Sequence, residues 1–386
     1  MSAGSKIEWT QATWNPVTGC KPVSPGCLNC FAARDSHRLG KNPHPKIAGK
    51  YRELTVMRGG RAVFNGTVRT HDDCLTIPLS WRKPRRIFVN SESDLFHEDV
   101  PFEFVDRVWA VMALCPHHTF QVLTKRPERM AEYLASRTAV DDSMRVDRMP
   151  QWYQVATAML DEGAESLPRG AWQRGHDRMP DPTQPLPNVW LGTSVEDQER
   201  ANERIPHLLR CPAAVRWLSM EPMLGAVDLQ VSLAFAIMEG LGGERGLDWV
   251  VVGGESGTHV RPMHPDWARS LRDQCQAAGV PFFFKQWGEW EPFYERDRDD
   301  PGWRSVPAES QSVMRINLTG EQGFHGERVV YFRRVGKHAA GRMLDGRTWD
   351  ELPANSGRES TAVSNGNSTG GIERNFLQPW HVGGKP

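Results

Sequence analysis

Six short apolar runs constrain the fold of this chain more than any other feature. Each run is rich in β-branched or aromatic residues and ends in small or polar residues, and a helical pattern often follows it. Near-continuous apolar strands, buried on both faces, are typical of a parallel sheet. The runs cover residues 86–89, 119–123, 188–191, 215–218, 249–252 and 281–284.

The segments between these runs carry helix signals. Pro101 begins one helix, Ser194 with Asp197 gives a capping-box pattern before a second, and Pro265 begins a third. In each, apolar residues recur on one helix face. Repeated βα units predict an α/β fold, a partial or full TIM-like (β/α) barrel with its chemistry at the carboxyl ends of the strands. One more strand before residue 20 gives about seven units, against eight in a closed barrel.

Two regions interrupt this pattern. Residues 136–187 are rich in charge, Pro and Gly and are too long for an ordinary connection. We expect an insertion there, either a lid over the barrel mouth or a disordered excursion. Residues 1–290 would then form the barrel with its insertion, and residues 291–353 a C-terminal appendage. Residues 354–386, dominated by Ser, Gly and Asn, are predicted to be a disordered tail.

The composition limits the partners of the chain. Its 386 residues carry 47 acidic and 47 basic side chains. No global field therefore attracts it to nucleic acid or membrane, although a local basic face would suffice for DNA binding. No apolar run approaches the roughly 20 residues that cross a bilayer, and the start does not resemble a signal peptide. We expect a cytoplasmic protein with no membrane partner.

Three of the seven cysteines, Cys20, Cys27 and Cys30, fall within eleven residues. Three thiolates on one loop can bind three irons of a [4Fe–4S] cluster and leave the fourth iron open for a small ligand. The segment before the loop reads as extended and residues 31–39 as a helix, so the loop lies where α/β folds place their chemistry. A zinc site remains an alternative, because His37 could complete a Cys3His set. A disulfide is not expected, since the cysteine count is odd and the other four are scattered.

The cysteine loop resembles the cluster loop of the radical S-adenosylmethionine (SAM) superfamily. The last two cysteines are separated by two residues, as in that superfamily, whereas the first gap is six residues instead of the usual three. Residues 7–20, Ile-Glu-Trp-Thr-Gln-Ala-Thr-Trp-Asn-Pro-Val-Thr-Gly-Cys, and later segments including 337–353 more closely resemble a phage and prophage family described as radical-SAM-like. This resemblance runs through most of the chain.

The resemblance implies two cofactors, a [4Fe–4S] cluster and SAM. By order along the chain, the segment after the second strand would receive the SAM amino group, and the segment after the fourth would bind its ribose and carboxylate. Ser194 is equally typical of a helix cap. The glycines after the sixth strand would approach adenine or substrate. The expected cofactor-binding residues are Ser91, Glu92, Ser93, Asp94, Thr193, Ser194, Glu196, Glu221, Gly253 and Gly254.

Other strand-end residues are expected to face the substrate, where cations could bind a carboxylate or phosphate. Structural ion pairing is the alternative role for each. These residues are Lys125, Arg126, Glu255, Lys285 and Gln286. No residue is singled out as catalytic.

The phage resemblance suggests a nucleic-acid or nucleotide substrate. We expect a radical SAM enzyme of the isomerase, mutase or lyase type that acts on a modified thymine base in phage DNA, in the host cytoplasm, with a reductase or flavodoxin-type electron donor. Two alternatives remain. One is a DNA repair enzyme resembling photoproduct lyase, and the other is a non-catalytic, zinc-stabilised nucleic-acid-binding protein.

Overall fold

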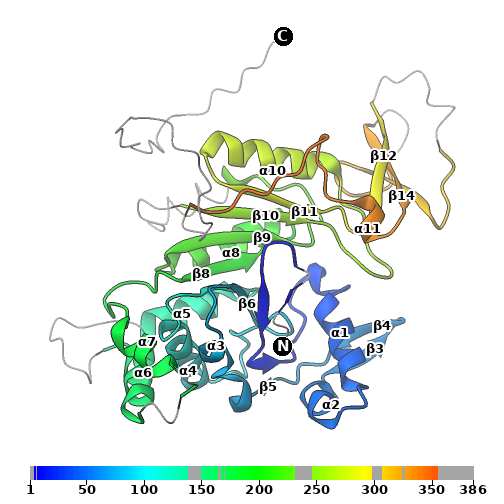
Figure 1. The fold of residues 1–386 in the computed structure, drawn as a ribbon. Helices are drawn as coiled ribbons and strands as arrows, with labels where there is room; N and C mark the ends of the chain where they lie inside the picture. The colour runs from blue at the N-terminus through cyan, green and yellow to red at the C-terminus, as the bar shows by residue number, and fades with distance from the viewer. Residues whose placement is uncertain are drawn as a thin grey trace.

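The computed structural model describes residues 4–5, 7–137, 149–163, 167–168, 170–230, 246–297, 307–323 and 327–354. Within these ranges, seven parallel strands form one sheet that curls into a half-barrel, with β1 and β11 at its two ends (Figure 1). This confirms the mixed α/β class and is compatible with a partial TIM-like barrel. The strand order is β1 (Ala12–Trp14), β6 (Arg86–Val89), β7 (Thr119–Thr124), β8 (Val189–Ser194), β9 (Val215–Met220), β10 (Trp249–Gly253) and β11 (Phe282–Gln286).

All six predicted apolar runs are strands of this sheet, and both of its faces are buried. In β10, Val250 and Val252 belong to the large core beneath the helices, whereas Trp249 and Val251 belong to a second cluster on the inner face. Successive side chains of a strand point to opposite faces, so burial on both faces requires an unbroken apolar run. This explains why polar and apolar residues do not alternate along these strands.

An aromatic cluster fills the inner face of the half-barrel. The rings of Trp9 and Trp217 meet edge-on with centroids 5.3 Å apart, and Trp217 and Trp249 lie 5.4 Å apart. Edge-on and tilted aromatic pairs add to the energy of area burial. The cluster comprises Trp9, Phe88, Trp190, Val215, Trp217, Trp249, Val251 and Phe283. It forms a rigid floor beneath the carboxyl ends of the strands.

Helices cover the outer face. They include α4 (Phe102–Ala113), α5 (Pro127–Arg137), α8 (Gln198–Arg210) and α10 (Pro265–Ala278). As predicted, α4 begins after Pro101 and α10 begins at Pro265. The cap of α8 differs from the prediction: Asp197 is the N-cap and accepts a 2.9 Å hydrogen bond from the Arg200 amide, while Ser194 is the last residue of β8.

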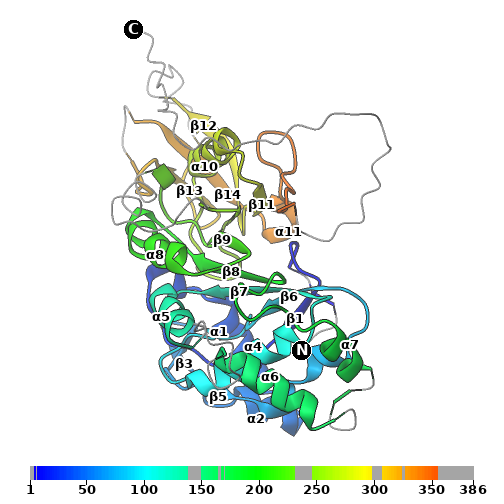
Figure 2. The same cartoon turned by 90° about the vertical axis from the view of Figure 1, so that its left-hand side faces the viewer.

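The described part of the insertion is helical and packs on the outside of the barrel. Helix α6 (Gln151–Asp161) lies against α4, and α7 (Ala171–Asp177) follows it (Figure 2). Trp152 is 2% exposed and belongs to the core under the helices. The described residues therefore do not form the expected lid. Their apolar side chains pack against the outer helices instead. Residues 138–148, 164–166 and 169 lie outside the described ranges.

The C-terminal appendage contains a three-stranded antiparallel sheet. Its order is β12 (Trp290–Arg296), β14 (Val329–Arg334), β13 (Val313–Asn317), and α11 (Lys337–Ala340) follows. The chain then returns to β11, where Asp350 forms an antiparallel bridge with Phe283 and the Phe284 amide donates to the Trp349 carbonyl. The segment thus covers the exposed edge of β11. Of the predicted tail, residues 354–386, only Ala354 is among the described residues. Among the described helices, none has the length and apolar character needed to span a membrane.

Between β1 and β6 the chain makes an excursion of which only the first helix was predicted. It contains α1 (Phe31–Gly40), α2 (Pro45–Tyr51) and a hairpin of β3 (Thr55–Arg58) and β4 (Arg61–Phe64). A short pair, β2 (Val17–Thr18) with β5 (Arg69–Thr70), closes its base. A small core of Ala32, Ala33, Tyr51, Leu54 and Phe64 holds it together. In Figure 1 these elements group on one side of the molecule, away from α6 and α7.

Candidate functional site

A cavity of about 630 Å³ opens at the carboxyl ends of the parallel strands. Trp9 and Phe88 of the aromatic cluster contribute its floor, and the cysteine loop lies along its rim. All three loop cysteines line it. So do eleven other residues predicted for the site, namely Ser91, Ser93, Asp94, Lys125, Arg126, Ser194, Glu221, Gly254, Glu255, Lys285 and Gln286.

The cysteine loop runs from β2 to α1. Cys27 ends a 3-10 turn (Pro25–Cys27), and Cys30 is the residue immediately before α1. Burial is the largest influence on Cys30 and raises its pKa, and backbone hydrogen bonds from Ala33 and Ala32 at the start of α1 oppose it. Amide donors at a helix start stabilise a thiolate, which is the form that binds metal. The loop therefore presents Cys30 to donors that suit a ligand role.

The other two thiols have contrasting environments. Burial, followed by the charge of Asp94, raises the pKa of Cys20 to about 12, although Arg126 Nη1 lies 3.7 Å from its sulfur and opposes the shift. Burial also acts to raise the pKa of Cys27, but the Lys125 ammonium and hydrogen bonds from the loop outweigh it, so the net pKa is lowered. Cys27 is thus the most thiolate-like of the three.

A buried ion-pair network supports the loop from below. Glu196, which is fully buried, accepts hydrogen bonds from Ser24 Oγ at 2.7 Å and from Arg204 Nη1 at 3.0 Å, and it pairs with Lys125 Nζ. Gly26 packs so closely that a Cβ there would lie 2.5 Å from Glu196 Oε1. The spacing leaves no room for a side chain at Gly26. Glu196 is therefore a tether between the loop, β7 and α8.

Asp94 anchors the same wall. Its Oδ1 accepts from Thr124 Oγ1 at 2.7 Å, and its Oδ2 accepts from the Lys125 amide at 3.0 Å and from Arg126 Nη1 at 3.2 Å. Arg126 also pairs with Glu98 at 3.1 Å. Both Asp94 oxygens are thus used within the protein, which favours a positioning role for Asp94 over direct ligand contact.

The opposite wall carries a second set of charges. Lys285 Nζ lies 2.7 Å from Glu221 Oε1 and 5.9 Å from the centre of the Trp9 ring. Glu255 accepts from Asn29 Nδ2 at 2.9 Å and pairs with Arg261, whose guanidinium also donates to the Pro25 carbonyl. Charged pairs from the ends of β9, β10 and β11 therefore reach the cavity or the loop above it.

Four buried polar atoms of cavity-lining residues have no hydrogen-bond partner among the described residues. They are the Gln286 Oε1 and Asn29 Oδ1 acceptors and the Asn90 Nδ2 and Trp9 Nε1 donors. The Gln286 amide is oriented by its Nε2 atom, which donates to the Gly254 carbonyl at 3.2 Å. Buried polar groups are normally paired, so these atoms are the first candidates for contacts to a bound molecule.

Four predicted site residues do not line the cavity. Thr193 donates to the Thr124 carbonyl, Glu196 forms the tether below the loop, and Gly253 packs against Glu221, where a Cβ would lie 2.8 Å from Oε1. Glu92 faces α1 and accepts from Ser36 Oγ at 3.3 Å. Gly254 does line the cavity, but a Cβ there would lie 2.0 Å from the Trp287 carbonyl oxygen. Close packing thus accounts for both glycines, against the Glu221 side chain at Gly253 and against the Trp287 backbone at Gly254.

Glu92 should give the protein a measurable pH dependence. Burial, followed by the charge of Asp35, raises its pKa to about 8. Because the folded pKa exceeds the unfolded value of about 4.3, stability should fall as pH rises between these values. The free energy of unfolding of Glu92→Gln, relative to that of the wild type, is therefore expected to rise by roughly 2 to 4 kcal/mol from pH 5 to pH 9. Urea unfolding at both pH values tests this, and an unchanged difference between variant and wild type would contradict it.

The three loop thiols are chemically suited to an iron–sulfur cluster. In the described ranges, no three Cys, His, Asp or Glu side chains converge closely enough to hold one metal ion. His37, the fourth ligand of the zinc alternative, bonds to Thr55 Oγ1 through Nδ1 at 3.0 Å and does not line the cavity. In a [4Fe–4S] cluster each thiolate binds a different iron, so the cysteine sulfurs stand around the whole cluster and do not converge on one metal ion. Three soft thiols around one open cavity fit that requirement.

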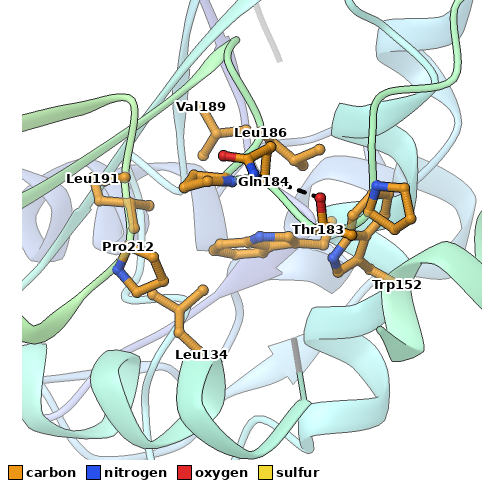
Figure 3. A pocket seen from close by; sticks show the side chains of 12 residues that line it. Leu134, Trp152, Thr183, Gln184, Leu186, Val189, Leu191 and Pro212 are labelled. Atoms are coloured by element: carbon orange, nitrogen blue, oxygen red, sulfur yellow. Dashed lines mark hydrogen bonds between the residues drawn. The ribbon is translucent and has the colours of Figure 1, made fainter. Parts of the chain in front are cut away.

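A second pocket of about 90 Å³ lies on the outside of the sheet (Figure 3). Trp152 and the segment with Thr183 and Gln184 line it together with Leu191 of β8. It shares no lining residue with the cysteine cavity and contains no ionisable side chain. We therefore place the candidate site at the cysteine cavity.

Comparison with known proteins identifies the family of this chain. The chain fits the model of a family described as "Protein of unknown function (DUF5131)" over residues 4–353. The chain belongs to the DUF5131 family. No curated protein and no solved structure matches it significantly. In this DUF5131 member the matched span takes in both the parallel half-barrel and the antiparallel sheet of the appendage. The family description assigns no reaction.

Several supporting residues of this DUF5131 site were missed in the sequence. Arg204 stands on the otherwise apolar face of α8 with Ala201, Ile205 and Leu208, and a lone charge in such a stripe indicates a buried partner. Ser24, Asn29 and Arg261 carry no comparable signal. They are brought to the site by loop conformations that local sequence does not encode.

Proposed function

We propose that this protein is a radical SAM enzyme and that Cys20, Cys27 and Cys30 bind a [4Fe–4S] cluster with one open iron. The observation that carries the proposal is that three closely spaced thiols line one cavity at the carboxyl edge of a parallel half-barrel. With both cofactors bound, one electron would cleave a carbon–sulfur bond of SAM and give a 5′-deoxyadenosyl radical that abstracts hydrogen from the substrate.

The residues of the chain would bind, orient and shield these groups. The cavity volume of about 630 Å³ falls within the roughly 300–1,000 Å³ of small-molecule sites. The Glu221–Lys285 pair offers one charge of each sign, which matches the amino and carboxylate groups of an amino acid. Trp9 and Phe88 offer an apolar surface to a planar ring, and they exclude water from the floor.

The proposed substrate is a modified thymine base in phage DNA, and the proposed reaction is a radical rearrangement. Support for the radical comes from the superfamily resemblance and the cysteine cavity. Support for the base comes from the resemblance to the phage family. The electron donor would be a reductase or flavodoxin-type protein. Comparing the nucleosides of phage DNA by mass spectrometry, with and without this protein, would identify the modified base.

SAM cleavage tests the proposal. The protein is reconstituted anaerobically with iron and sulfide, reduced with dithionite and incubated with SAM. We expect 5′-deoxyadenosine to form in the wild type. A properly folded, iron-loaded protein that forms none with SAM and reductant would overturn the proposal. A colourless protein with a single bound zinc would favour the non-catalytic nucleic-acid-binding alternative.

A further inference from the structure

The excursion between β1 and β6 is strongly basic in a chain whose formal charge is zero. Residues 31–70 contain nine Lys and Arg but only two Asp and Glu, a net charge of +7. They form α1, α2 and the β3–β4 hairpin around a small apolar core. A concentrated positive field on one structural unit is the electrostatic signature of a nucleic-acid-binding face.

Most of these cations are not neutralised within the protein. Arg38 pairs with Asp35, Arg69 with Glu53, and Lys50 with Asp73 of the following segment. The other six form no ion pair within the described residues. Arg61 is half-buried and the remaining five are exposed. The six are Arg34, Lys41, Lys46, Arg52, Arg58 and Arg61.

The hairpin holds two of these cations side by side at its tip. Arg58 pairs with Arg61 in the strand register, and Gly59 and Gly60 between them have φ of 55° and 75°. Two central residues with positive φ are the requirement of a tight hairpin turn, which fixes the two arginines in position. An added Cβ at Gly60 would lie 4.0 Å from His259 Nε2, so the tip reaches the loop that follows β10 at the cavity.

Exposed apolar side chains lie among the same charges. Of the nine large apolar residues that are exposed in the described ranges, six fall between residues 23 and 57. Phe31 is 47% exposed and lines the cavity beside Cys30. An aromatic ring beside cations can stack on an unpaired base while the cations bind the phosphate backbone. The other five are Val23, Leu28, Ile47, Val56 and Met57.

We propose that residues 31–70 form a DNA-backbone-binding surface that presents one base of a DNA strand to the cysteine cavity. The inference deepens the proposed function, on which it rests for the role of the cavity, by naming the part of the chain that would bind the backbone of the DNA substrate. An enzyme that acts on a base must receive it outside the helical stack, and Phe31 lies at the place where an extruded base would enter.

DNA binding by the full-length protein, without SAM, tests this surface. Fluorescence anisotropy is measured with a labelled 20-nucleotide single strand, the matching duplex and an RNA strand of the same sequence. The double variant Arg58→Ala/Arg61→Ala and a second, Lys41→Ala/Lys46→Ala, are each expected to weaken DNA binding about 10-fold and to reduce the salt slope by about 2. The control, Arg82→Ala/Lys83→Ala, removes two exposed cations before β6 and should bind like the wild type.

Absence of DNA binding, equal weakening by the control, or clearly tighter binding of RNA would each overturn the inference. Circular dichroism establishes that the variants are folded. SAM cleavage without DNA separates this result from the proposed function. If the protein cleaves SAM but does not bind DNA, only the DNA-binding surface is contradicted. If it binds DNA through these arginines but does not cleave SAM, only the radical SAM assignment is contradicted.

Discussion

Glu196→Gln is expected to lower the free energy of unfolding by about 3–5 kcal/mol at pH 7, the usual effect of breaking a buried ion pair by removing one partner. The substitution keeps the size of the side chain but leaves Lys125 and Arg204 without their shared carboxylate. The side chains of these cations are only 19% and 2% exposed, so water can solvate them only in small part after the carboxylate is lost. Urea unfolding followed by circular dichroism measures the change.

The effect should depend on pH. Burial acts to raise the pKa of Glu196, but the charges of Lys125 and Arg204 outweigh it and the net pKa is lowered. A depressed folded pKa stabilises the protein above the unfolded value of about 4.3, and this stabilisation is lost as pH falls through the folded value. The difference between wild type and Glu196→Gln should therefore shrink below about pH 4.

Glu199→Gln is the matched control for this variant. Glu199 lies three residues away, its side chain is 80% exposed, and it pairs with Arg200 at the surface. Exposed ion pairs contribute about 0–1 kcal/mol, so the control should stay near the wild type. Wild-type stability in Glu196→Gln at pH 7 would show that the network does not support the loop.

Cys27→Ala is expected to abolish the iron–sulfur spectrum and to reduce SAM cleavage by more than about 100-fold, because changes to outer-shell partners alone typically cost 10–100-fold. Cys27 is the thiol with the lowered pKa, and Ser24 Oγ lies 3.7 Å from its sulfur. Its removal would leave only two of the three proposed cysteine ligands on the loop. Iron content and 5′-deoxyadenosine release are measured after the same anaerobic reconstitution.

Cys275→Ala controls for the loss of a thiol elsewhere. Cys275 is 2% exposed in α10, and it packs in the core under the helices, away from the cavity. This variant should keep its iron and its SAM cleavage even if the cavity left in the core lowers its stability. Undiminished turnover in Cys27→Ala would refute the assignment of that cysteine as a cluster ligand.

The sheet was the most predictable part of the fold. Runs such as residues 249–252 are apolar on both faces, and only a strand buried on both sides requires that pattern. The β3–β4 hairpin was missed because β3 is largely exposed, β4 is mostly half-buried and both carry arginines, so no apolar period marks them. The packing of α6 against α4 was also missed, since charge, Pro and Gly around residues 136–187 conceal Trp152 and Ala156.

The candidate site was predictable where residues follow strands directly. Asp94, Lys125 and Glu221 follow β6, β7 and β9, and Lys285 lies near the end of β11. All four strands belong to one parallel sheet, which brings their carboxyl ends to one edge. Position along the chain does not reveal which way a side chain points. Glu92 and Ser93 are adjacent, yet Glu92 contacts α1 while Ser93 lines the cavity and donates to the Val17 carbonyl.

Metal stoichiometry is the measurement that tests the central claim most directly. The wild-type protein, reconstituted without oxygen and then desalted, should contain about four irons and four sulfides per chain, and its reduced paramagnetic resonance spectrum should change when SAM is added. A folded protein that holds one zinc and no iron, or a cluster spectrum that SAM leaves unaltered, would contradict the assignment of three cysteines to a cluster with an open iron.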